Sequence, residues 1–175
     1  WLQVSGFAVT QVKNITDVGH MTMDTAADAK GEDKIEKEAR RIARERRGEG
    51  AEIEMADVLG VAAMYTEQYL LDEQALNILP PAHRPKATET VPEMIVLVQT
   101  LVKAGHAYET KDGVYFSVES FPSYGKLSGN TLANLDKLRE GNRVIAQETK
   151  THPADFALWK KRVGENAKHV LFWDS

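Results

Sequence analysis

A short β-type segment that ends on polar side chains constrains the fold of this chain more than any other feature. Residues 8–16 alternate between apolar and polar side chains and are rich in β-branched residues, so they predict a strand. The segment ends on Asn14, Thr16 and Asp17, whose short polar side chains favour strand ends and turns. In an open α/β sheet, ligands bind just beyond the carboxyl ends of strands. We therefore expect ligand contact at this strand end, and an ordinary turn is the alternative interpretation.

Two long helical stretches follow this strand. Residues 18–30 are rich in Asp, Thr, Gly and Ala and predict a loop, and residues 32–47 then predict a helix with one narrow apolar stripe. Residues 53–77 predict a second helix, and residues 80–86, which begin with two prolines, predict a linker. The second helix is expected to bury a broad apolar face made of Leu59, Ala62, Ala63, Leu70 and Leu76. A strand followed by helices indicates an α/β fold at the amino end.

The second half of the chain predicts a mixture of helices and strands. Thr90-Val91-Pro92-Glu93 has the form of a capping box, so we expect a helix that begins there and ends at Gly105, with His106 as a capping or packing residue. Residues 107–118 carry a hairpin signal centred on Lys111-Asp112-Gly113. Residues 131–140 predict a short helix, and the apolar run 156–159 predicts a buried strand with Phe156 in the core.

Composition and charge restrict the chemistry that this chain can perform. It has 175 residues and no cysteine, which excludes disulfides, thiolate catalysis and any zinc site with a cysteine ligand from this chain. No stretch approaches the roughly 18 consecutive apolar residues of a membrane helix, so we expect a cytoplasmic protein without membrane association. The net charge of −4 provides no global positive field, so nucleic acid would have to contact local basic patches.

The histidines and arginines do not form obvious sites. No two histidines lie at the short spacing of metal ligands; they are His20, His83, His106, His152 and His169. The arginine-rich run at residues 40–47 is a candidate nucleic-acid patch, but it is interleaved with glutamates, so a solvated helix face is the favoured interpretation.

A series of short motifs occurs in order along nearly the whole chain. They are Asn-Ile-Thr-Asp-Val-Gly-His (14–20), Gly-Glu-Asp-Lys (31–34), Ala-Leu-Asn-Ile-Leu-Pro-Pro (75–81), Arg-Pro-Lys-Ala-Thr-Glu (84–89), Pro-Glu-Met-Ile (92–95), Lys-Ala-Gly-His-Ala-Tyr (103–108), Gly-Val-Tyr-Phe (113–116), Tyr-Gly-Lys-Leu-Ser-Gly (124–129) and Asp-Phe-Ala-Leu-Trp-Lys (155–160). In these motifs the chain resembles cysteinyl-tRNA synthetase, a class I aminoacyl-tRNA synthetase. The chain resembles an internal segment of the proteins in that family.

The resemblance implies a fold and a parent activity. Residues 1–79 would be part of a class I nucleotide-binding (Rossmann-like) domain, and residues 80–175 would be an α+β connective insertion that stops before the block with a zinc ligand. The parent enzyme activates cysteine with ATP and attaches it to its cognate tRNA, and it is expected to be a monomer. ATP and zinc (Zn) would be its cofactors, with their main ligands outside this chain.

The resemblance also carries expectations for individual residues. Thr16 would lie beside the substrate cysteine, while Asn14 and Asp17 would support the turn. Lys126 would be a contact for the tRNA acceptor end. His20 would be a loop residue and not an ATP ligand, because the family's His-Ile-Gly-His motif precedes the strand at residues 8–16. The resemblance assigns no catalytic residue and no metal ligand to this chain.

Three interpretations of the activity remain at this stage. The chain alone is expected to be inactive, because it lacks the His-Ile-Gly-His motif, the Lys-Met-Ser-Lys-Ser loop and the zinc ligands of the synthetase. One alternative is the related cysteine ligase of mycothiol synthesis, which shares the fold and the activation of cysteine. The other is a non-catalytic, synthetase-like binding module.

Overall fold

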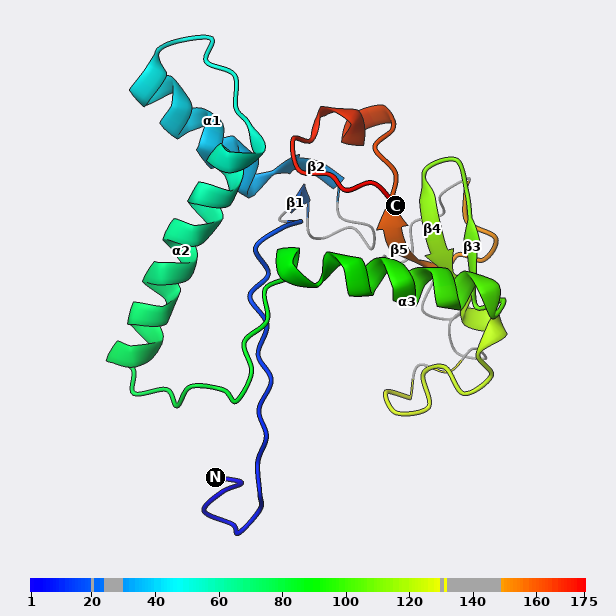
Figure 1. The fold of residues 1–175 in the computed structure, drawn as a ribbon. Coiled ribbons are helices and arrows are strands. Elements are labelled where there is room, and N and C mark those ends of the chain that lie inside the picture. Colours follow the sequence, from blue (N-terminus) through cyan, green and yellow to red (C-terminus); the bar gives the residue numbers. More distant parts are fainter. Residues whose placement is uncertain (20, 24–29, 130, 132–148) are drawn as a thin grey trace. The chain divides into compact units, whose positions relative to one another are not determined.

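The computed structural model describes residues 1–19, 21–23, 30–129, 131 and 149–175 of the chain (Figure 1). The regular elements of these residues are helices and small antiparallel sheets, in agreement with the α/β class predicted from the sequence. The chain splits into two compact units. The first unit comprises Trp1–His20 with Lys34–Pro92, and the second comprises Met21–Asp33 with Glu93–Ser175.

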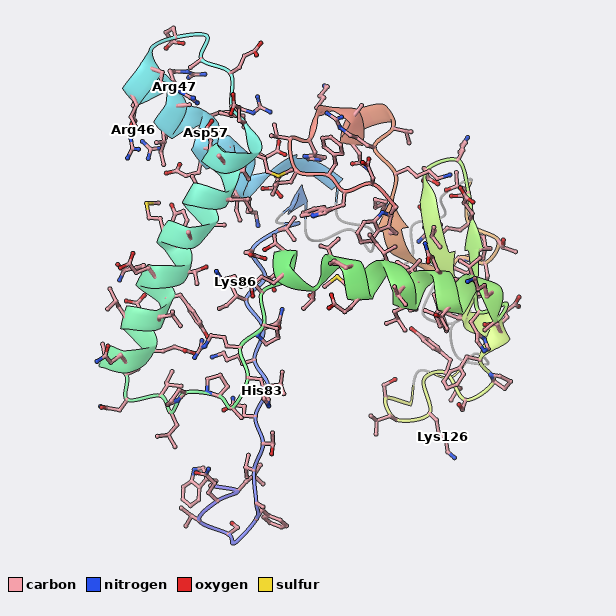
Figure 2. The ribbon with its side chains drawn as sticks, in the orientation of Figure 1. Arg46, Arg47, Asp57, His83, Lys86 and Lys126 are labelled. Atoms are coloured by element: carbon pink, nitrogen blue, oxygen red, sulfur yellow. The ribbon has the colours of Figure 1, made fainter. Side chains whose placement is uncertain are left out.

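The amino-terminal β-type segment of the first unit is extended and pairs in parallel with a distant part of the same unit. Isolated bridges join Val12 to His83 and Ile15 to Lys86, and both partners are labelled beside the extended segment in Figure 2. The backbone N–H of Ile15 donates to Pro85 O at 2.8 Å. The expectation of a regular strand at residues 8–16 was therefore wrong. Residues 80–86 form no named helix or strand, as predicted for a linker, but they carry the two bridges to the amino-terminal segment. Pro85 has no N–H to donate, which explains why the pairing is interrupted.

Helices α1 (Lys34–Arg47) and α2 (Met55–Ala75) follow and pack against one another. Their contact is built from small and β-branched side chains; the buried ones are Ala39 and Ala43 of α1 and Val58, Val61 and Ala62 of α2. Asp57 sets the start of α2, because its carboxylate accepts the Glu54 N–H at 2.9 Å and binds Arg47 at 2.8 Å (Figure 2). Both predicted helices are confirmed.

The apolar face that the sequence predicted for α2 was largely wrong. Ala62 is buried, but Leu59 and Leu70 are exposed and Leu76 is 71% exposed. The face that packs on α1 runs through Val58 and Val61 instead. The pattern of apolar residues therefore identified the helix but not the side of it that is buried.

Helix α3 (Val91–Lys103) begins without the predicted capping box. Residues Thr88–Thr90 already form a short 3-10 helix, and the Thr90 hydroxyl donates back to Ala87 O at 3.1 Å. The predicted end of α3 is confirmed. Gly105 has a φ of 78°, its N–H donates to Val102 O, and the N–H of His106 donates to Leu101 O, which is the Schellman arrangement.

The second unit contains two small antiparallel sheets. β3 (Ala107–Glu109), β4 (Gly113–Phe116) and β5 (Phe156–Lys160) are neighbours in that order, so the predicted hairpin and the strand near residue 156 are confirmed. β1 (Met21–Met23) pairs with β2 (Lys30–Asp33), so the prediction of a continuous loop over residues 18–30 was wrong. Short 3-10 helices lie at Val118–Ser120 and Gly164–Lys168.

β5 is not the buried strand that its sequence predicted. Phe156 is 36% exposed, although its ring stacks on the ring of Phe116, with the two ring centroids 5.1 Å apart. Among the described strands, β5 pairs with β4 alone, so it is an edge strand of this sheet. The helix predicted for residues 131–140 lies outside the described residues, apart from residue 131. Within the described residues, no helix combines the length and apolarity that a membrane span requires.

Candidate functional site

A cavity of about 520 Å³ lies in the first unit, where the extended amino-terminal segment meets α1 and α2. Its lining comprises Asn14, Ile15, Thr16, Asp17, Lys34, Ile35, Glu38, Ala62, Tyr65, Thr66 and Tyr69. The structure thus brings the three polar residues of the predicted strand end into the wall of one cavity. Their roles toward a ligand stay predictions.

Asn14 and Thr16 form a hydrogen-bonded pair on this wall. The Asn14 side-chain amide donates to the Thr16 hydroxyl oxygen at 3.0 Å, and both residues are exposed. A hydroxyl group has one proton to donate and two lone pairs. The Asn14 amide occupies one lone pair and so restricts the directions in which the Thr16 hydroxyl can act.

Asp17 is buried, and Thr88 binds its carboxylate. It is 6% exposed, and its two carboxylate oxygens accept the Thr88 N–H at 3.0 Å and the Thr88 hydroxyl at 2.6 Å. Both oxygens are therefore engaged within the protein. The arrangement suits a residue that fixes the strand end more than one that binds a ligand directly.

Helix α2 supplies another part of the cavity lining. Tyr65 and Tyr69 are one helical turn apart, and Thr66 donates its hydroxyl proton to Ala62 O at 2.7 Å. Tyr69 donates its hydroxyl proton to Glu73. Sequence reasoning did not assign this wall to the site. The spacing of four residues places both tyrosines on one side of the helix, but no local signal says what that side faces.

The amino-terminal part of α1 adds charged groups to the cavity. Lys34 and Glu38 both line it, and Glu38 receives two hydrogen bonds from Arg41, at 2.8 Å and 2.6 Å. These bonds from Arg41 lower the pKa of Glu38, so its carboxylate stays ionised at neutral pH. Together, an ammonium, a carboxylate, the paired amide and hydroxyl of Asn14 and Thr16, and two aromatic rings can hold a small zwitterion such as an amino acid.

The described residues offer no fit for a metal ion. None of them form a group of three or more His, Cys, Asp or Glu side chains placed to hold one, so no zinc set is found in that part of the chain. His106 pairs with Ser120 at 2.9 Å, and His152 accepts the Ala154 N–H at 3.1 Å. His20 lies outside the described residues.

The candidate nucleic-acid contacts lie elsewhere. Lys126 is exposed in a loop of the second unit (Figure 2) and is not part of the cavity lining. On α1, arginines form ion pairs with carboxylates of the chain; the pairs are Arg40–Glu36, Arg41–Glu38, Arg41–Glu45, Arg44–Glu49 and Arg47–Asp57. This pairing supports the interpretation of residues 40–47 as a solvated helix face.

Comparisons with known proteins agree over the whole chain. A family described as the catalytic domain of class I (C) tRNA synthetases matches residues 1–175. The cysteine–tRNA ligase of Chlorobium luteolum is 47% identical over 175 residues, which is all of this chain and 32% of that protein. The cysteine–tRNA ligases of Salinibacter ruber and of a strain of Thermus thermophilus are 45% and 44% identical over 170 residues, 97% of this chain.

The chain spans about a third of the length of these curated relatives, at 32%, 30% and 31%. The resemblance seen in the sequence motifs and the α/β fold class are thereby confirmed, since the family match extends over every residue of the chain. The chain belongs to the family of class I (C) tRNA synthetase catalytic domains.

Proposed function

We propose that the protein to which this chain belongs is a cysteine–tRNA ligase, which activates cysteine with ATP and transfers it to the 3′ end of its cognate tRNA. One observation carries the proposal: the chain is 47% identical, over its full length, to a protein named cysteine–tRNA ligase. Residues 1–79 would be part of the nucleotide-binding domain and residues 80–175 the connective insertion. The enzyme would be a cytoplasmic monomer.

The cavity at the strand end supports a role in holding the amino acid. Thr16 would orient the substrate cysteine with its hydroxyl group, and Asn14 would direct that hydroxyl through its 3.0 Å hydrogen bond. Asp17 would keep the strand end in place through Thr88. ATP and zinc would be bound mainly by residues outside this chain. What this chain contributes is positioning of a reactant, which can account for a large part of an enzymatic rate acceleration.

The decisive experiment is cysteine-dependent exchange of pyrophosphate into ATP, measured on the complete protein with zinc and on residues 1–175 alone. We expect exchange by the complete protein and none by residues 1–175. Absence of exchange in the complete protein would contradict the proposed function. Transfer of the activated cysteine to an amino sugar in preference to tRNA would indicate the related mycothiol ligase.

A substitution at the cavity tests the assigned role of Thr16. Thr16→Val in the complete protein keeps the shape of the side chain and removes its hydroxyl, so the KM for cysteine should rise by about tenfold, the cost of one lost hydrogen bond to a charged group. Thr100→Val is the matched control, because the Thr100 hydroxyl donates within its own helix, to Val96 O at 2.8 Å. An unchanged KM in Thr16→Val would remove Thr16 from the site.

The tRNA contact is tested separately. Lys126→Ala should weaken tRNA binding and lower the slope of log K against log salt by about 1, as loss of one phosphate contact requires. Lys37→Ala is the control, because Lys37 is an exposed lysine on α1. A salt slope that does not change in Lys126→Ala would exclude this contact.

A further inference from the structure

A buried carboxylate, Glu73, lies behind the α2 wall of the cavity. Glu73 is 6% exposed and is not part of the cavity lining. Three donors from separate parts of the first unit reach it: the Lys13 ammonium and the Tyr69 hydroxyl at Oε1, and the Arg84 guanidinium at Oε2, 2.6 Å away. We call Lys13, Tyr69, Glu73 and Arg84 the Glu73 cluster. Of its four members, Tyr69 is the one that also lines the cavity.

Lys13 and Arg84 also contact the ring of Tyr69, in addition to the bond that Glu73 makes with its hydroxyl. The Lys13 Nζ lies 5.1 Å from the ring centroid, and the Arg84 Cζ lies 5.8 Å from it, both within the range of cation–π attraction. The hydroxyl bond to Glu73 holds the far end of the ring, and so restrains the direction of the ring axis. Tyr69 therefore presents its ring to the cavity in one orientation, with its polar end turned toward Glu73.

The charges of the cluster make the carboxylate necessary for this arrangement. Lys13 and Arg84 bring two positive charges against the single negative charge of Glu73, and the Arg84 Nη1 is buried without a hydrogen-bond partner in the described part of the chain. Without a carboxylate, the two cations would repel each other and would no longer converge on the Tyr69 ring. A simple structural ion pair would join the same segments, but it would not need a cavity-lining tyrosine on the same carboxylate oxygen.

We propose that Glu73 is a positioning residue, which, with Lys13 and Arg84, holds Tyr69 rigidly in the wall of the cavity that Thr16 also lines. This inference rests on the proposed function, in which that cavity receives the substrate cysteine. Glu73 touches no substrate and acts only through Tyr69. It sets how well the amino acid is held and not how ATP is bound.

The test uses the complete protein with two substitutions and their combination. Glu73→Gln keeps the size of the side chain and removes its charge, whereas Tyr69→Phe keeps the ring and removes the hydroxyl that Glu73 holds. Each should raise the KM for cysteine by about three- to tenfold in pyrophosphate exchange, with the KM for ATP unchanged. Because both act through one contact, the double variant should be little worse than either single variant.

Asp57→Asn is the matched control for a purely structural effect. Asp57 is also a carboxylate of α2 paired with an arginine, but its partners Arg47 and Glu54 do not line the cavity, whereas Tyr69, the partner of Glu73, does. It should lower the unfolding temperature and leave the KM for cysteine unchanged. If Glu73→Gln behaves in the same way, or if the effects of Glu73→Gln and Tyr69→Phe simply add, the positioning role is overturned.

A second readout separates this inference from the proposed function. With ring-labelled tyrosine, NMR relaxation of the complete wild-type protein should show a rigid Tyr69 ring axis, and Glu73→Gln should make that axis more mobile. If the wild-type protein lacks cysteine-dependent exchange, the proposed function fails, and the mobility of the ring axis alone then decides whether Glu73 holds Tyr69. Equal mobility of the ring axis in both proteins overturns the inference.

Discussion

Both carboxylate oxygens of Asp17 are bound by one residue, Thr88, which lies 71 positions further along the chain. The Thr88 N–H donates at 3.0 Å and its hydroxyl at 2.6 Å, so the contact joins the end of the extended amino-terminal segment to the 3-10 helix at Thr88–Thr90. Asp17 is buried, and hydrogen bonds to a buried carboxylate are stronger than those between neutral groups. This contact fixes one edge of the cavity.

Asp17→Ala should therefore loosen the backbone at Thr88. Two donors would lose their acceptor, which costs about 2–3 kcal/mol. Hydrogen exchange at the Thr88 amide measures this directly, because the amide is protected only while Asp17 holds it. Thr88→Val is the control that removes the hydroxyl alone, at a cost of about 1 kcal/mol. Equal protection in Asp17→Ala and the wild type would show that the contact does not stabilise this edge.

Asp155 organises the second unit in a comparable way. It is 2% exposed and accepts the Tyr108 hydroxyl at 2.7 Å, the Val118 N–H at 2.9 Å and the His152 N–H at 3.0 Å. Burial and the bond to this carboxylate raise the pKa of the Tyr108 hydroxyl.

Asp155→Asn should lower the pKa of Tyr108 toward its ordinary value. The carboxylate stabilises the protonated phenol by accepting its proton, and a neutral amide does so less strongly. Ultraviolet absorbance during an alkaline titration follows the phenolate, and Tyr108→Phe identifies which part of the signal belongs to Tyr108. A Tyr108 pKa that stays unchanged, or rises further, would contradict this account.

Gly113 in β4 has no room for a side chain. A Cβ at this position would lie 2.5 Å from Trp159 O of the neighbouring strand. Gly113→Ala should destabilise the sheet of β3, β4 and β5 by about 2–3 kcal/mol through overpacking against backbone.

Gly60→Ala provides the opposite control, because nothing lies within 4 Å of the added Cβ and Gly60 is inside α2. It should stabilise the helix by about 0.5–1 kcal/mol. Thermal unfolding compares the two variants. A Gly113→Ala protein as stable as the wild type would mean that the strands separate at little cost.

The Glu73 cluster predicts how stability changes in acid. Hydrogen bonds from Lys13, with those from Tyr69 and Arg84, lower the pKa of Glu73 from 4.5 to about 2 in the folded chain. The unfolded chain therefore takes up this proton first as the pH falls. The stabilising contribution is fully present above about pH 4.5 and is lost as the pH falls toward 2.

Unfolding temperatures measured between about pH 2 and pH 6 test this effect. The wild type should lose stability over that interval more steeply than Glu73→Gln, which has no carboxylate at this position to protonate. The difference between the two curves isolates the contribution of Glu73 from that of other carboxylates. Parallel curves would show that Glu73 is not ionised preferentially in the folded chain.

Local signals in the sequence were sufficient where the determinants lie within a few residues of each other. Gly105 ends α3 because its positive φ permits the Schellman bonds. The hairpin signal at residues 111–113 was sufficient because it lies between β3 and β4, which follow each other in the chain and pair with one another. The structure places Asn14 and Thr16 in the wall of a cavity, which the sequence did not predict. Their roles toward a substrate stay predictions.

The remaining features depend on contacts between distant residues, which a sequence pattern does not reveal. The partner of Ile15 is Lys86, in a stretch that the prolines marked as a linker. The wall made by Tyr65 and Tyr69 depends on which side of α2 faces the strand end. In the sequence Glu73 is one more charge on a helix, and only the convergence of Lys13 and Arg84 distinguishes it from solvated glutamates.

The parallel pairing of the amino-terminal segment has a consequence for synthesis on the ribosome. The separation of 71 positions from Asp17 to Thr88 takes about 4–14 s to translate at roughly 5–20 residues per second. The strand end leaves the ribosome first, α1 (Lys34–Arg47) and α2 (Met55–Ala75) follow, and Thr88 comes last, so the contact forms only after both helices have been synthesised. We expect φ-values near zero at Ile15 and well above zero at Val58, and the reverse order would contradict this sequence of events. The wall that carries Thr16 would then be among the last parts of the first unit to form.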